Sequence, residues 1–105
     1  MNIEEKQQVL FVNLIVMFHS LAWQQLGKVK NPTTGEIERN MEAARGLIDS
    51  LEMLKAKTEG HRNEDEERFL NDVLKELRLN YVDEVTKDMN KPPSVDNSPD
   101  GAKVP

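Results

Sequence analysis

The side chains with the clearest potential for acid–base or metal chemistry are the two histidines, His19 and His61. Neither histidine belongs to an HExxH pattern or is paired with carboxylates at metal-ligand spacing. We expect His19, which falls among apolar residues, to be a core histidine bonded to a carbonyl. We expect His61, beside Gly60, to be an exposed loop or capping residue. The sequence therefore predicts no metal ligand.

A charged flank in the middle of the chain is the next candidate. Arg45, Asp49 and Glu52 follow one another at i, i+4 and i+7 spacing, which is typical of an ion-pair ladder on a helix surface. The alternative is a polar cluster at a helix interface. Lys55 falls within an apolar stripe, so we expect its stem to cover apolar surface while its amine reaches solvent. An interhelical pair with Glu76 is the alternative.

Other catalytic patterns are missing from the sequence. The segment GKVKNPTTGE lacks the order of a phosphate-binding loop, and Ser20 and Ser50 lack the context of a nucleophile elbow. The acidic run EDEE lacks the alternation of a calcium-binding loop, and the chain contains no cysteine. We therefore assign no catalytic, cofactor-binding or metal-ligating residue, and we expect no cofactor.

Composition limits the class of protein. The chain has 105 residues, of which 31% are charged and 37% hydrophobic, and its net charge is −5. These values are typical of one small helical domain with a polar surface. Nucleic-acid binding is not expected, because no cluster of lysine and arginine is present. The lack of cysteine and of a signal-peptide pattern in MNIEEK fits a cytoplasmic protein.

Three helices must position these residues. Apolar periodicity predicts helices over about 3–26, 38–58 and 64–88, and Gly27 and Gly60 end the first two. Asn63 is the predicted N-cap of the third helix, with Glu66 as its capping-box partner. We expect residues 1–88 to form a single all-α domain.

Two other segments are predicted to lack helix. The proline-rich tail, 89–105, contains few large apolar residues and is expected to be disordered. The connection between the first two helices has turn chemistry and is a candidate structured turn, with these residues: Asn31, Pro32, Thr34, Gly35 and Glu36.

The first helix differs from the other two because apolar side chains occupy nearly its whole circumference. The second and third helices form an amphipathic hairpin, which covers only about half of such a helix. We therefore expect a second copy of the chain to complete the three-helix fold, giving a homo-oligomer. The residues chosen for this interface are Phe11, Val12, Ile15 and Phe18.

Membrane contact is the rival explanation for the apolar helix. Its strictly apolar part, 9–18, is interrupted by Asn13 and is short for a segment that spans a bilayer. The helix also lacks the lysine-rich face of an interfacial anchor. We therefore favour self-association, with membrane association through this helix as a second alternative.

A narrow polar seam runs along the same helix through Lys6, Asn13, Ser20 and Gln24. These residues can simply face solvent. Alternatively, Asn13 and Ser20 lie inside a helix–helix interface, where their hydrogen bonds fix the register. In that case Asn13→Leu should change the size of the oligomer.

Several segments carry a resemblance to a known family. In order they are Leu26-Gly27, then NPxTGE, then ARxxIDxLExLxxKTxG, and finally LRLxYV, which ends at Val82. This pattern resembles a small bacterial helical family catalogued only as a domain of unknown function, over about 10–82. The resemblance implies a helical, cytoplasmic bacterial protein and supplies no activity, substrate or cofactor.

The motif residues include polar ones that core packing alone does not require. We interpret Arg45, Asp49 and Arg78 as a structural cluster that ties the second helix to the third.

Two functions remain open from the sequence. The favoured one is a non-enzymatic, self-associating interaction module, which presents its loops or its tail to a partner. The alternative is a small enzyme or ligand binder with a site between subunits, which would use these residues: Arg45, Asp49, Glu36 and His19.

Overall fold

The computed structural model describes residues 1–91 as three α-helices and their connections. The helices are α1 (Ile3–Gln25), α2 (Met41–Lys57) and α3 (Glu64–Met89). The predicted all-α, three-helix fold is confirmed. The disorder expected for 89–105 falls mostly outside the described residues.

Each helix is preceded by an asparagine N-cap, whose side-chain oxygen accepts a hydrogen bond from the backbone N–H three residues later: Asn2, Asn40 and Asn63. Glu66 completes the capping box predicted at Asn63. The second helix begins at Met41, three residues later than expected. Asn40 acts as the cap there, which leaves Ile37 outside the helix with 52% of its surface exposed.

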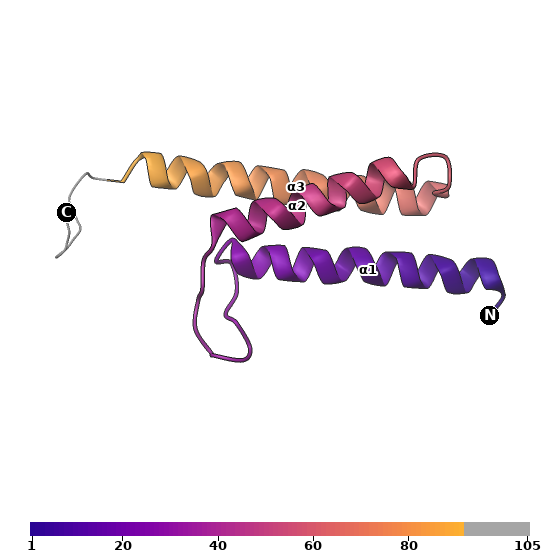
Figure 1. Ribbon diagram of the computed structural model, residues 1–105, viewed down its shortest axis with the longest axis horizontal. Coiled ribbons are helices and arrows are strands. Elements are labelled where there is room, and N and C mark those ends of the chain that lie inside the picture. Colours follow the sequence, from indigo (N-terminus) through magenta and orange to yellow (C-terminus); the bar gives the residue numbers. More distant parts are fainter. Residues whose placement is uncertain (92–105) are drawn as a thin grey trace.

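The helices run up, down and up in an elongated, flat molecule measuring 59 × 27 × 16 Å. Figure 1 shows α2 and α3 forming a hairpin, with α1 lying along one side of it. Every pair of helices is in contact. The loop between α1 and α2 extends beyond the end of α1, on the side away from the hairpin (Figure 1).

The core lies where the three helices meet. Its buried apolar residues come from all of them: Ile15, Ala22, Leu26, Ala44, Ile48, Leu51, Leu70, Val73, Leu74 and Leu77. Most of these positions recur every three or four residues, so each helix turns one stripe inward. Within the described residues, no helix combines the length and apolar character required to cross a bilayer.

Candidate interaction surface

The inner face of α1 is fully used by the chain's own core. Ile15 and Ala22 are completely buried, and Phe11, Phe18 and Trp23 are partly buried against the same core. A helix that sits beside a two-helix hairpin can bury only the face that points toward it. The opposite face of α1 must therefore meet solvent or another molecule.

This geometry corrects the interface residues chosen from sequence. Ile15 has no exposed surface left for a second chain, and Phe11 and Phe18 pack mainly against the core. Val12 is at the boundary and is half-buried. Helical periodicity shows that α1 is apolar on both faces, but it does not indicate which face the hairpin covers.

The outer face of α1 carries the exposed apolar residues. We define it as Ile3, Val9, Leu10, Leu14, Val16, Met17 and Leu21, which are 37–66% exposed. Lys6, Asn13 and Ser20 of the polar seam are also exposed and lie along this face. At 100° per residue, Ile3, Leu10, Leu14, Met17 and Leu21 form one apolar stripe on one side of these polar residues, whereas Val9 and Val16 lie on the other side. Single exposed apolar residues are ordinary on a protein surface, whereas a continuous apolar stripe along a helix is typical of a contact surface.

His19 lies on the border between the two faces of α1. Its Nε2 is 2.7 Å from Oε1 of Glu76 in α3, and its ring stacks on Trp23 with centroids 5.3 Å apart. The expected carbonyl partner is thus replaced by a carboxylate. Within residues 1–91 the alternative pair between Lys55 and Glu76 is not formed, and Lys55 lies near Glu67 at the start of α3 instead.

The charged flank of α2 faces a groove between α2 and α3, with a volume of about 350 Å³. Arg45 pairs with Asp49 at 3.3 Å in its own helix, and its guanidinium lies 5.8 Å from the ring centroid of Tyr81 in α3. Arg78 pairs across the groove with Glu52. Two of the three cluster residues therefore contact the neighbouring helix, while Asp49 pairs within α2.

This groove is a poor candidate for a catalytic site. Its arginines are paired with carboxylates and are half-exposed or more, so their charges are compensated and solvated. Neither His19 nor Glu36 lines it, so the four residues of the enzyme hypothesis are not brought together.

The loop between α1 and α2 is held by its own side chains. Asn31 accepts a hydrogen bond from the backbone of Thr33 and donates one to Glu38, and its carbonyl accepts from Gly35. The backbone of Gly35 has φ +75°, which glycine adopts without strain. The Thr34 hydroxyl accepts from the Glu36 backbone. The loop is thus a compact turn capped by side chains.

A further polar cluster, formed where both ends of this loop meet α3, is centred on Glu84. Its carboxylate is only 10% exposed and accepts hydrogen bonds from Lys28 at 2.7 Å, Arg39 at 3.0 Å and Lys87 at 3.0 Å. Arg39 also bonds Asp88 at 2.9 Å. The Lys28 bond, assisted by Lys87 and opposed by burial, lowers the pKa of Glu84 to about 2.

Sequence reasoning missed this cluster. The only signal was a basic spot after the first helix, which includes Lys28. Its partner lies in another helix, and only the folded chain brings the two together. The cluster fixes the loop on the hairpin and presents no free reactive group.

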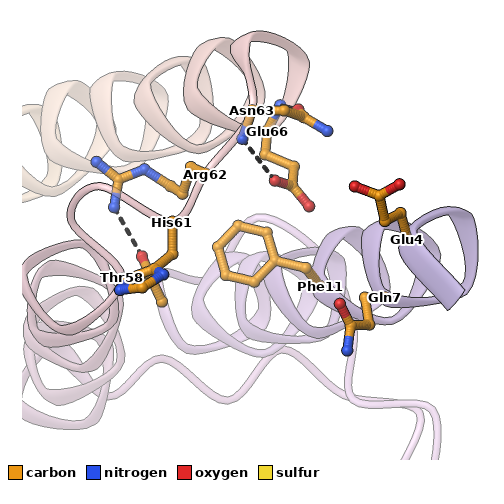
Figure 2. A pocket seen from close by; sticks show the side chains of 8 residues that line it. All are labelled: Glu4, Gln7, Phe11, Thr58, His61, Arg62, Asn63 and Glu66. Atoms are coloured by element: carbon orange, nitrogen blue, oxygen red, sulfur yellow. Dashed lines mark hydrogen bonds between the residues drawn. The ribbon is translucent and has the colours of Figure 1, made fainter.

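A pocket of about 280 Å³ lies where the start of α1 meets the turn between α2 and α3. Figure 2 shows Phe11 pointing into it, with His61 and Glu66 nearby and Glu4 across the opening. Glu66 accepts the Asn63 backbone N–H at 2.8 Å, and Arg62 donates to the Thr58 hydroxyl at 2.7 Å (Figure 2).

Most polar groups of this pocket therefore cap helices. His61 is exposed, as expected from sequence. Among residues 1–91, no group of three or more histidine, aspartate or glutamate side chains could hold a metal ion.

No curated protein and no solved structure matches this chain. Residues 8–83 match the model of a family described as a domain of unknown function, DUF1844, which confirms the resemblance seen in the sequence. Because the match spans most of the chain, this protein belongs to the DUF1844 family.

Proposed function

We propose that this protein is a non-enzymatic interaction module that self-associates through the outer face of α1. One observation carries the proposal: five large apolar side chains form an exposed stripe along a single helix whose inner face is already in the core, namely Ile3, Leu10, Leu14, Met17 and Leu21. At about half exposure, burying each would contribute about 1 kcal/mol. Summed along the helix, this contribution is comparable to the stability of a small domain, about 5–15 kcal/mol.

A second copy of the chain fits this surface better than an unrelated partner. In a two-fold dimer the same patch meets itself, so one apolar helix face supplies both halves of the interface. Within residues 1–91, α2 exposes one large apolar residue, Met53, and α3 exposes three, Leu79, Val82 and Met89, all in its C-terminal half, so neither helix offers as long a stripe as α1.

The test is the solution mass by light scattering, for wild type and for the variants Leu10→Asp and Met17→Asp. Both residues are more than half exposed, so a charge there leaves the core intact. We expect an oligomeric wild type and monomeric, helical variants. Leu79→Asp in α3 is the matched control, because Leu79 is 63% exposed but lies away from α1, and its mass should equal that of wild type.

Two results would contradict the proposal. The first is a wild type that remains monomeric at all concentrations. The second is an oligomer that dissociates with Leu79→Asp and persists with both α1 variants, since that would place the interface on α3.

A further inference from the structure

The outer face of α1 has an internal order that goes beyond being apolar. Five of its residues follow one another at spacings of seven, four, three and four positions: Ile3, Leu10, Leu14, Met17 and Leu21. Together with Gln7 and Gln24 they fill every a and d position of a heptad pattern across the whole helix. This is the spacing of a two-helix coiled-coil seam.

We propose that two copies of the chain pair their α1 helices antiparallel along this seam, in the register that sets Leu10 opposite Leu14 of the second copy. The inference rests on the self-association proposed above and specifies its geometry. In this register Ile3 packs against Leu21 of the other copy and Gln7 packs against its Met17. Gln7 is then the polar residue among the paired positions of the seam.

The shape of the molecule favours the antiparallel arrangement. The loop between α1 and α2 extends past one end of α1, on the side away from the hairpin (Figure 1). In a parallel pair both loops would occupy the same end of the seam and obstruct each other. In the antiparallel pair each loop lies just beyond the start of the other copy's helix. Val29 and Ile37 of the loop, which are 44% and 52% exposed, are then placed near the dimer.

Charge favours the same arrangement. Glu4 and Glu5 occupy the first turn of α1. A parallel pair would bring these carboxylates next to their own copies. In the antiparallel register the two Glu4 positions are about 24 Å apart at 1.5 Å per residue. This separation exceeds the Debye length of about 8 Å at physiological salt, so the repulsion is screened.

The polar seam then acquires a role. Asn13 lies beside the a/d residues and close to the helix centre, so the two copies of Asn13 come together near the two-fold axis. Two amides can each donate and accept, and such a pair penalises any shifted register that separates them. Lys6 of one copy lies beside Ser20 of the other on the same edge of the seam.

The sequence contains no cysteine, which allows a direct test by site-directed cross-linking. Lys6→Cys and Ser20→Cys change exposed polar residues and leave the apolar seam intact. We expect a short bismaleimide to cross-link a mixture of the two variants, and to give little product with either variant alone. Asn13→Cys should cross-link to itself. Asp72→Cys, on the exposed side of α3, should give no cross-linked dimer.

The outcomes separate the two proposals. Efficient cross-linking of Lys6→Cys alone and of Ser20→Cys alone would indicate a parallel pair and overturn the antiparallel inference, while self-association would stand. A dimeric mass without any of these products would also overturn the inference. A monomeric mass at all concentrations would overturn both proposals.

Discussion

The ammonium group of Lys28 donates a 2.7 Å hydrogen bond to Oε2 of Glu84, joining the segment that follows α1 to the far end of α3. Arg39, from the other end of the same loop, donates to Oε1 of Glu84 at 3.0 Å and to the Glu84 carbonyl at 3.2 Å. One carboxylate thus holds both ends of the loop against the hairpin. Gly27, between α1 and Lys28, turns the chain toward this contact with φ +83°.

The first prediction concerns the pH dependence that this carboxylate imposes. Its pKa is about 2 in the folded chain and about 4.5 when unperturbed. Since the folded pKa is depressed, the stabilisation is fully present above about pH 4.5 and is lost as the pH falls toward 2. Glu84→Gln should destabilise the protein by about 2 kcal/mol at pH 7, because Lys28 and Arg39 lose their counter-charge.

Thermal unfolding of wild type and Glu84→Gln between pH 7 and pH 2.5 measures this effect. The difference in Tm between them should be constant down to about pH 4.5 and should shrink below it. A difference that stays constant to pH 2.5 would show that the Glu84 charge does not stabilise the fold.

The second prediction separates the two faces of α1. Ile15→Ala removes a fully buried side chain and should lower the free energy of unfolding by roughly 3 kcal/mol. Leu14→Ala, the adjacent residue, which is 37% exposed, should cost only about 1–2 kcal/mol when unfolding is measured at a dilution where the protein is monomeric. Equal costs at that dilution would contradict the assignment of the two faces.

The third prediction concerns Arg62, whose side chain is 4% exposed. It donates to the Lys55 carbonyl at 2.6 Å, the Thr58 hydroxyl at 2.7 Å and the Glu67 carboxylate at 2.7 Å. It therefore joins the end of α2 to the start of α3. Arg62→Ala should destabilise the protein by about 2–3 kcal/mol, and Arg62→Lys should recover only part of this because lysine lacks the planar fork of donors.

Arg68→Ala is the control for this substitution. Arg68 also forms an ion pair, with Asp65 at 2.6 Å, but both side chains are more than 60% exposed. Its removal should change the unfolding free energy by less than about 0.5 kcal/mol in urea denaturation. If Arg62→Ala and Arg68→Ala lowered the unfolding free energy equally, burial would not be the cause of the Arg62 effect.

The fourth prediction compares two glycines. Gly27 has φ +83°, and a Cβ added there would lie 3.3 Å from the side chain of Arg39, so Gly27→Ala should cost about 1–2 kcal/mol. Gly46 lies inside α2 with no atom within 4 Å of an added Cβ, so Gly46→Ala should stabilise the protein by about 1 kcal/mol. Calorimetric Tm values should move in opposite directions, and a common direction would be inconsistent with these backbone assignments.

Local signals predicted much of the fold. The Asn63–Glu66 capping box and the turn residues around Gly35 are short-range patterns, and the chain adopts them where the sequence places them. Glu38 is predicted to lie inside a helix, but α2 begins at Met41. Asn40 caps the helix there, and the side chain of Arg39 donates a hydrogen bond to Glu84 of α3. Because this bond joins residues far apart in the chain, local periodicity does not indicate it.

The candidate surface was predicted only in part. Sequence indicated that α1 has more apolar surface than one hairpin can cover, but it selected Ile15, which is buried, and it did not select Leu10 or Met17, which are exposed. The apolar character of all three residues is the same. Only their positions relative to the hairpin distinguish them.

The sequence by itself determined the three helices, the capping box at Asn63 and the family, because these depend on residues a few positions apart or on a linear motif. The tertiary structure decided which face of α1 is buried, that His19 meets Glu76, and that Glu84 holds the ends of the loop. These contacts join residues distant in the chain. Their formation depends on how the helices pack and on the desolvation of a few charged groups, which no local pattern records.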